Sequence, residues 1–181
     1  MSMRCTLVGM PGSGKSTVGR HLARRLACPF VDMDQLLEER LGCSIRDYFD
    51  AHGEAAFRDR EAALLAELAA NGAGAVLSTG GGTVLRESNR ALLRTACAPV
   101  FYLRASADEI WRRLRHDHKR PLLQVDDPQE RLRALYQTRD PLYRDVAHYV
   151  IETRRATVQG LVNMVQMQLE LAEAGAGTAP R

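Results

Sequence analysis

Lysine is almost absent from this chain: Lys15 and Lys119 are the only two among 181 residues, and arginine supplies the other 23 of its 25 Lys and Arg positions. Long apolar runs are absent as well, and none approaches the ~20 residues that a membrane-spanning helix requires. Neither sign of charge dominates, because 22 acidic residues are intermixed with the basic ones. The lack of long apolar runs argues against a membrane protein. The balance of intermixed charges argues against a nucleic-acid-binding surface.

Cysteine forms no recognisable pattern. The four cysteines, at positions 5, 28, 43 and 97, are scattered, without a C-x-x-C pair or the cysteine–histidine spacing of a zinc site. We therefore expect reduced thiols, most of them buried. Residues 1–4 lead directly into an apolar run, which leaves no room for a signal peptide, so a cytoplasmic protein is expected.

Short apolar runs alternate with longer helical patterns along the chain. The runs that predict strands cover residues 5–8, 29–32, 75–79, 99–103 and 148–152. Strands separated by helices are typical of a parallel sheet with right-handed crossovers. We predict an α/β fold of three layers, in which a five-stranded parallel sheet carries helices on both faces. One domain over residues 1–173 fits this length, and the aperiodic residues 174–181 are expected to form a disordered tail.

A glycine-rich run follows the first predicted strand. Residues 9–16 fit G-x-x-x-x-G-K-[ST], the phosphate-binding loop of nucleotide-using proteins; a turn without a ligand is the alternative. Glycines let consecutive N–H groups turn toward phosphate oxygens, and the following helix adds its positive N-terminal end. Lys15 is expected to reach the β- and γ-phosphates, and the Ser16 hydroxyl to bind Mg²⁺. The predicted ATP contacts of this loop are Gly12, Ser13, Gly14, Lys15, Ser16 and Thr17.

Two carboxylates follow the second predicted strand. Asp32 and Asp34 are two residues apart, so at a strand end they would share one face, about 6 to 7 Å apart. Asp32 is predicted to hold the metal ion together with Ser16. Asp34 is predicted to orient an acceptor hydroxyl and to take its proton late, which a loose phosphoryl-transfer transition state permits. Alternatively, Asp34 only caps a helix that begins at Gln35.

Further candidates are a glycine triplet and two arginines. Gly80, Gly81 and Gly82 follow the third predicted strand, and their bare backbone is expected to lie against a ligand. A plain flexible loop is the alternative. Arg58 ends the run G-E-A-A-F-R, and Arg139 begins R-D-P-L-Y. Each could equally be a solvated surface arginine, and neither is diagnostic alone.

The most basic segment of the chain, residues 112–120, runs into Pro-Leu-Leu. It lies where a lid would fold over a bound nucleotide, and we predict a mobile lid over approximately residues 113–125. Such a lid excludes water from the reacting phosphate. Arg120 is predicted to swing in with it and to stabilise charge on the transferred group.

Together these motifs resemble the shikimate kinase family of P-loop small-molecule kinases. Their order is G-x-x-x-x-G-K-S, D-x-D, G-E-x-x-F-R, T-G-G-G, R-P-L-L and R-x-P-L-Y, and the resemblance covers residues 4 to about 172. It implies an ATP-dependent phosphotransferase with Mg²⁺ as cofactor. It also implies transfer of the γ-phosphoryl group to the 3-hydroxyl of shikimate, a step in the synthesis of chorismate and the aromatic amino acids.

The resemblance further implies roles for the acceptor side of the site. Asp34 would bind the substrate hydroxyls and position the attacking one. Arg58 and Arg139 would grip the carboxylate, a task suited to planar and permanently charged side chains. The backbone of residues 80–82 would contact the substrate, and Phe57 would form an apolar wall.

On the nucleotide side, the resemblance implies that Arg120 reaches the phosphates from the lid. Adenine would be contacted by the loop after the last strand, which gives Arg155 as a candidate, with Arg112 as a second one. We expect shikimate and ATP as the small-molecule partners of a monomer. The alternatives are a gluconate-type kinase of the same fold and a catalytically silent nucleotide-binding regulatory module.

Overall fold

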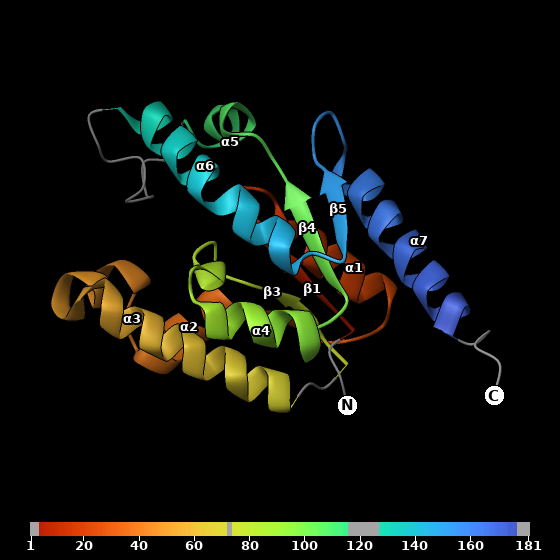
Figure 1. Ribbon diagram of the computed structural model, residues 1–181, viewed down its shortest axis with the longest axis horizontal. Helices are drawn as coiled ribbons and strands as arrows, with labels where there is room; N and C mark the ends of the chain where they lie inside the picture. The colour runs from red at the N-terminus through yellow and green to blue at the C-terminus, as the bar shows by residue number, and fades with distance from the viewer. Residues whose placement is uncertain (1–3, 72–73, 116–126, 177–181) are drawn as a thin grey trace.

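The computed structural model describes residues 4–71, 74–115 and 127–176 of the chain. Within these residues, five strands form one parallel sheet in the order β2-β3-β1-β4-β5 (Figure 1). The strands are β1 (Cys5–Val8), β2 (Phe30–Asp32), β3 (Val76–Ser78), β4 (Val100–Arg104) and β5 (Tyr149–Glu152). Every boundary lies within one residue of the predicted one, and the predicted α/β fold with a five-stranded parallel sheet is confirmed.

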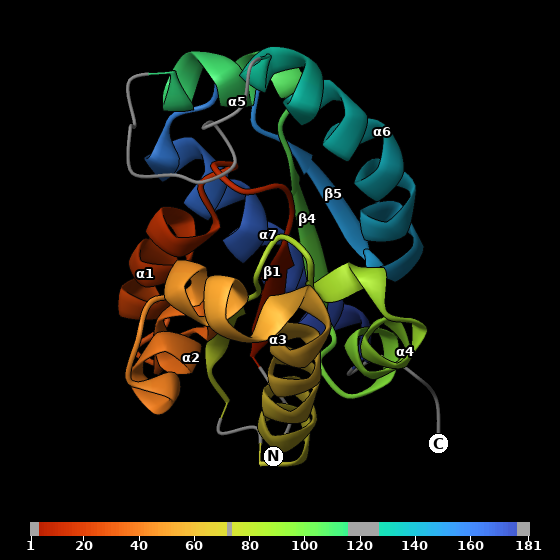
Figure 2. The ribbon, with the colours of Figure 1, turned by 90° about the vertical axis from the view of Figure 1, so that its left-hand side faces the viewer.

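Helices cover both faces of this sheet (Figures 1 and 2). They are α1 (Lys15–Arg25), α2 (Met33–Leu41), α3 (Ile45–Ala70), α4 (Glu87–Thr95), α5 (Ala107–Leu114), α6 (Pro128–Val146) and α7 (Val158–Ala176), with the 3-10 turn η1 (Thr83–Leu85) before α4. Helices α1 and α7 lie on one face, and α3, α4 and α6 lie on the other. The three predicted layers are therefore present in the described part of the chain.

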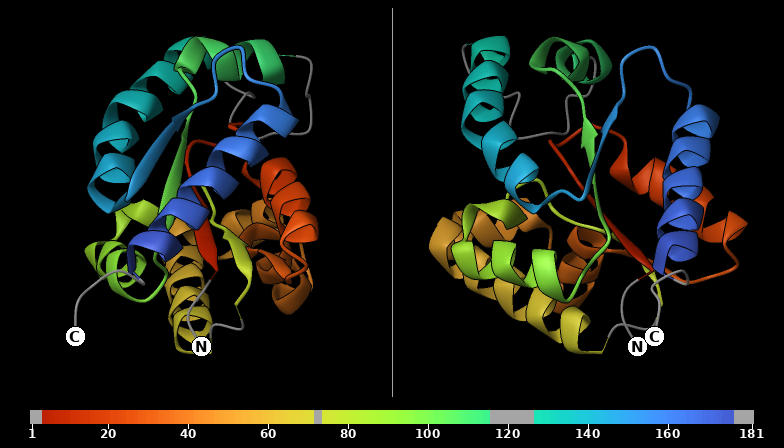
Figure 3. Two further views of the ribbon diagram at one scale, coloured as in Figure 1. Left: turned by 90° about the vertical axis from the view of Figure 1, so that its right-hand side faces the viewer. Right: turned by 45° about the vertical axis from the view of Figure 1, so that its right-hand side comes forward.

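Two apolar cores follow from the alternation of side chains along the strands, since successive strand residues point to opposite faces. Leu7 and Leu103 belong to the core beneath α1 and α7, the two helices that Figure 3 shows on the same side of the sheet. Leu77 and Tyr102 belong to the larger core beneath α3, α4 and α6. All four side chains have no exposed surface. The strands are thus held rigidly, and the loops at their carboxyl ends start from fixed points.

Helix α2 begins earlier than predicted. Its first residue is Met33, and Asp32 is the capping residue, with a side chain that accepts hydrogen bonds from the backbone N–H groups of Asp34 and Gln35. The alternative in which Asp34 caps a helix beginning at Gln35 is therefore wrong, and Asp34 is not a strand residue either. Asp32 ends the strand with an extended backbone, and an extended backbone is also usual for the residue that caps a helix. Its short side chain can therefore accept from the first N–H groups of α2.

One predicted boundary also needs correction. Helix α7 continues through Ala176, so residues 174–176 belong to a helix and not to the predicted tail; alanine is the best helix former and outweighs Gly175 here. Arg113 and Leu114, placed in the predicted lid, form the last turn of α5. Most of the predicted lid, Arg120 included, and residues 177–181 lie outside the described residues. No helix in the described ranges is long and apolar enough to cross a membrane.

Candidate active site

The phosphate-binding loop connects β1 to α1 at the carboxyl edge of the sheet. Gly12 and Gly14 adopt left-handed φ angles of 80° and 99°, which glycine adopts readily and other residues seldom do. The Lys15 ammonium donates hydrogen bonds to the backbone carbonyls of Gly9 at 2.9 Å and Met10 at 3.0 Å. Lys15 is only 7% exposed. The loop thus directs one nearly buried cation and the N-terminus of α1 into the same space, as a phosphate site requires.

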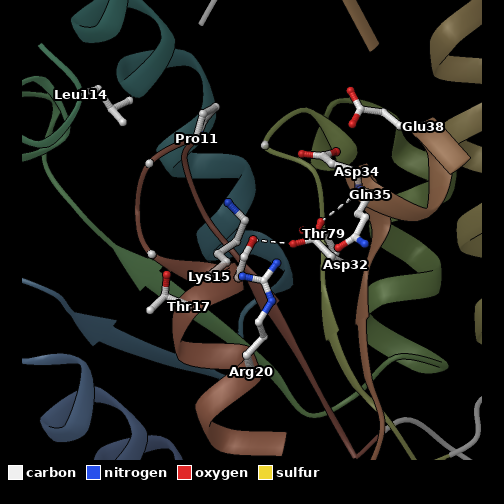
Figure 4. A pocket seen from close by; sticks show the side chains of 14 residues that line it. Pro11, Lys15, Thr17, Arg20, Asp32, Asp34, Gln35, Glu38, Thr79 and Leu114 are labelled. Carbon is white, nitrogen blue, oxygen red and sulfur yellow. Dashed lines mark hydrogen bonds between the residues drawn. The ribbon is translucent and has the colours of Figure 1, made fainter. Parts of the chain in front are cut away.

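This space is a cavity of about 430 Å³ in front of the loop (Figure 4). The predicted residues Gly12, Gly14, Lys15, Ser16, Thr17, Asp32, Asp34 and Gly81 line it, together with Pro11, Arg20, Gln35, Glu38, Thr79 and Leu114. Lys15 projects into it from α1, and Asp34 from α2. The cavity therefore brings the predicted phosphate contacts and both predicted carboxylates together. Ser13 does not line it, and its buried hydroxyl has no hydrogen-bond partner among the described residues.

Asp32 joins the phosphate loop to α2. Its Oδ2 accepts a hydrogen bond from the Ser16 hydroxyl at 2.5 Å, while Oδ1 accepts from the N–H groups of Asp34 and Gln35 at 3.2 and 3.4 Å. A hydroxyl and a carboxylate side by side are the hard oxygen donors that Mg²⁺ prefers. No group of three or more His, Cys, Asp or Glu residues suited to a metal occurs in the described ranges. The donor set fits Mg²⁺, which commonly takes one or two protein ligands and completes its shell with phosphates and water.

Asp34 lies in the first turn of α2, at the wall of the cavity. The residue is exposed to solvent, but partial loss of hydration beside the cavity wall raises the pKa of its carboxyl group to about 6. The nearby Lys15 ammonium opposes the shift, and the carboxylates of Asp32 and Glu61 add to it. A carboxyl group with such a pKa is suited to exchange a proton near neutral pH.

The glycine triplet packs tightly against three parts of the site. A Cβ on Gly80 would lie 2.6 Å from the Asp34 Oδ1, and one on Gly81 would lie 2.6 Å from the ring of Pro11 in the phosphate loop. A Cβ on Gly82 would overlap the Arg58 guanidinium. The backbone of this segment was predicted to lie against a ligand. In the structure, side chains of the protein itself also lie against it. Glycine here lets Asp34, the phosphate loop and Arg58 converge on one segment.

Arg58 is held by a buried acid that sequence reasoning missed. Its Nη1 donates to Glu61 Oε2 at 2.7 Å, and Glu61, 1% exposed, also accepts from the Thr83 hydroxyl at 2.8 Å. Phe57 is buried against the ring of Phe49, and the Arg58 guanidinium lies 5.2 Å from the centroid of the Phe57 ring, so its role as an apolar wall stays a prediction. The spacing of Arg58 and Glu61, three residues on a helix, was a usable signal, since such residues are neighbours.

Arg139 contacts the same glycine segment from α6. Its Nη1 donates to the Gly81 carbonyl at 3.1 Å, and the same oxygen accepts from the Tyr143 hydroxyl at 2.5 Å. Tyr143 is fully buried and lies one helical turn after Arg139. The two predicted arginines therefore meet at one loop, Arg58 beside Gly82 and Arg139 beside Gly81.

A second cavity, of about 410 Å³, lies between α5 and the loop after β5. The predicted adenine contacts Arg112 and Arg155 both line it, and Arg155 has a left-handed φ of 59°. Arg113, which we had not predicted as a ligand contact, also lines it. Its guanidinium donates to the Ser13 carbonyl at 3.3 Å and to the Thr153 hydroxyl at 3.2 Å. Arg113 therefore connects the phosphate loop with the loop after β5.

A parallel sheet whose first strand leads into a glycine-rich phosphate loop, with carboxylates from the end of β2 and the start of α2 in the same cavity, defines a P-loop phosphotransferase. A sequence model of the family described as shikimate kinase matches residues 11–170. The chain belongs to the shikimate kinase family, which is a family of enzymes.

Individual relatives agree with this assignment. The chain is 57% identical over 168 residues to a shikimate kinase of Paracidovorax citrulli, covering 92% of this chain and 91% of that protein. A solved structure of shikimate kinase from Acinetobacter baumannii in complex with shikimate is 42% identical, with a TM-score of 0.86 and 93% of each chain covered. A gluconokinase from Sinorhizobium meliloti is 17% identical with a TM-score of 0.59 over 99% of this chain and 98% of its own, which shows a shared fold alone.

Proposed function

We propose that this site transfers the γ-phosphoryl group of ATP to the 3-hydroxyl of shikimate, giving 3-phosphoshikimate and ADP. The assignment of the chain to the shikimate kinase family supports the reaction, and the relative from Acinetobacter baumannii was solved with shikimate. One observation carries the assignment of residues: the segment Gly80–Gly82 touches the phosphate loop, Asp34 and Arg58 at successive positions. The nucleotide side and the arginine side of the site are thereby joined.

On the nucleotide side, backbone N–H groups of residues 12–17 and the Lys15 ammonium bind the phosphates. Ser16 and Asp32 would hold Mg²⁺, which would supply positive charge to offset the negative charge of the ATP phosphates. Adenine lies in the second cavity, against Arg112, Arg113 and Arg155. Arg120, outside the described residues, remains a proposed contact to the phosphates.

On the acceptor side, Arg58 and Arg139 bind the carboxylate of shikimate and the backbone of residues 80–82 lies along its ring. Asp34 then orients the 3-hydroxyl toward the γ-phosphorus. The hydroxyl oxygen forms the new P–O bond, the bond between the γ-phosphorus and the β,γ-bridging oxygen breaks, and its electron pair leaves with ADP. Asp34 accepts the hydroxyl proton late in this step, because the transition state is loose.

Activity should decline in acid because Asp34 must be deprotonated to accept that proton. Since its pKa is raised to about 6, the active form is complete above about pH 7 and is lost as pH falls through about 6. The folded state binds this proton more tightly than the unfolded chain does. The stabilisation is therefore greatest below the usual pKa of 3.8 and is lost as pH rises through about 6.

The pH dependence of kcat/KM for shikimate, measured between pH 5 and 9, tests this assignment. We expect a tenfold fall per pH unit on the acid side, with a midpoint near 6. The accompanying effect on unfolding should stay below about 1 kcal/mol, because solvent reaches the carboxylate. A profile that is flat down to pH 5 would show that Asp34 is not the proton acceptor.

Alanine at Arg58 or Arg139 should raise the KM for shikimate much more than the KM for ATP. Loss of a desolvated charge partner costs ~2 to 5 kcal/mol, which corresponds to at least ~30-fold in affinity. Initial rates over a matrix of both substrates separate the two constants. Unchanged shikimate affinity in both variants would contradict the carboxylate assignment.

Two controls make this comparison specific. Arg58→Ala leaves Glu61 buried without its cation, which threatens the fold, so Arg58→Lys is measured beside it. Lysine keeps the charge for Glu61 but loses the planar fork, and we expect a smaller rise in KM. Arg94→Ala removes a surface arginine that pairs with Glu87 and Asp145 and should leave both constants unchanged.

Two other functions are less well supported than shikimate phosphorylation. A gluconate-type acceptor is disfavoured because relatives at 57% and 42% identity are shikimate kinases, whereas the gluconokinase is only 17% identical. A catalytically silent module is disfavoured because Lys15, Asp34, Arg58 and Arg139 are all present. A monomeric, cytoplasmic enzyme with small-molecule partners remains our prediction.

A further inference from the structure

A cluster of polar side chains lies just behind Arg139, where α6 meets the ends of β4 and β5. Asp140 is its centre, with a side chain that is 15% exposed. Its Oδ1 accepts hydrogen bonds from the Tyr102 hydroxyl at 2.8 Å and from Arg104 Nε at 3.0 Å, both from β4. Its Oδ2 accepts from Arg144 Nε at 2.8 Å. Two of these donors are charged, which gives the strong kind of hydrogen bond.

The strand side of this cluster is itself fixed. Tyr102 and Arg104 are two residues apart in β4, so they point to the same face of the sheet. Tyr102 is fully buried, and Arg104 Nη1 also donates to Glu152 of β5 at 2.8 Å. Asp140 therefore attaches α6 to β4 directly and, through Arg104, to β5.

Helix α6 needs such an attachment at this point because Pro141 lies inside it. Proline has no N–H, and its ring displaces the carbonyl four residues earlier, so the helix loses one internal hydrogen bond beside Arg139 and Asp140. The backbone alone then defines the direction of these side chains less firmly. The cluster around Asp140 replaces that lost restraint with contacts to β4.

Adjacent residues of a helix point about 100° apart around its axis. While Asp140 faces β4, Arg139 faces the glycine segment and donates to the Gly81 carbonyl. A rotation of α6 by about 10° would move a side-chain atom that lies ~5 to 6 Å from the axis by about 1 Å. A displacement of that size in a binding group can cost up to ~10²-fold in rate or affinity.

We propose that Asp140 is a positioning residue for Arg139: by attaching α6 to Tyr102 and Arg104 of β4, it sets the direction from which Arg139 meets the acceptor carboxylate. Asp140 itself does not touch the substrate. The inference rests on the proposed role of Arg139 in binding that carboxylate.

A double-mutant cycle tests the inference. Asp140→Ala should raise the KM for shikimate by about tenfold, with kcat and the KM for ATP changed by less than about twofold. In the Arg139→Ala background, the same Asp140→Ala change should leave the KM for shikimate unaltered, since there is no guanidinium left to position. Asp145→Ala is the matched control, because Asp145 also lies on α6 and pairs with two arginines, Arg90 and Arg94; it should leave all three constants unchanged.

The outcomes separate the inference from the function on which it rests. If Arg139→Ala leaves the KM for shikimate unchanged, the proposed role of Arg139 is wrong and the inference falls with it. If Arg139→Ala raises this KM and Asp140→Ala does not, only the inference is overturned. An equal rise from Asp140→Ala in both backgrounds also overturns it, because the effect would not pass through Arg139. Should the alanine variant not fold, the cycle is run with Asp140→Asn, for which the same pattern with a smaller rise is expected.

Discussion

Asp34→Asn should lower kcat by at least ~10²-fold while leaving ATP binding near that of the unchanged protein. Asparagine keeps the size of the side chain and its hydrogen-bonding capacity, but it cannot accept the proton of the attacking hydroxyl. The residue lines the cavity but is not a capping residue of α2, since Asp32 has that role. Removing its charge therefore leaves the start of the helix intact. Single-turnover measurements of phosphoryl transfer and a titration with ATP separate the two effects.

Asp50→Asn is the control for this substitution. Asp50 is an exposed carboxylate of α3, 3.9 Å from Arg46, and it does not line the cavity in front of the phosphate loop. Its replacement should leave turnover unchanged, because exposed pairs of this kind contribute little. A near-normal kcat for Asp34→Asn would show that Asp34 does not accept the proton of the attacking hydroxyl.

Lys15→Met should cause a loss of ~10² to 10³-fold in kcat and weaken ATP binding as well. The Lys15 ammonium is nearly buried and is held by the carbonyls of Gly9 and Met10, so it is already oriented before phosphate arrives. Methionine fills similar space without charge, and the negative charge that develops on the transferred group then lacks its cation. Steady-state kinetics with ATP as the varied substrate measures both effects.

Arg24→Met provides the comparison for the lysine change. Arg24 is an exposed residue of the same helix α1 and lies away from the loop, so its replacement tests whether loss of any cation from α1 lowers turnover. We expect no change in kcat. Turnover of Lys15→Met equal to that of Arg24→Met would mean that the loop does not act through this lysine.

The strands and the phosphate loop could be predicted from the sequence because their signals are local. The apolar run of residues 5–8 followed by G-x-x-x-x-G-K-S specifies strand, loop and helix in order. The start of α2 was missed since Asp32 ends an apolar run and also caps a helix, and periodicity cannot separate these two roles. The extension of α7 through Ala176 could not be predicted because the residues after 173 show no apolar periodicity.

The contacts that tie the site together could not be predicted, because they join residues far apart in the chain. Arg139 and Tyr143 meet Gly81 across 58 and 62 residues of sequence, and nothing local specifies that meeting. Glu61 is different: it lies three residues after Arg58, and an acid at that spacing on a helix predicts an ion pair. The tight packing of Gly80–Gly82 depends on which side chains surround the segment, and only the folded structure determines that.

The most direct test of the proposed function is to identify the phosphorylated product when the purified protein is given ATP, Mg²⁺ and one acceptor at a time. The acceptors are shikimate, gluconate and water alone, and ³¹P NMR reports the product. We predict one new phosphomonoester with shikimate, formed in equal amount to ADP, and no product with gluconate. Phosphorylation of gluconate but not shikimate, or release of inorganic phosphate regardless of acceptor, would contradict the proposed function.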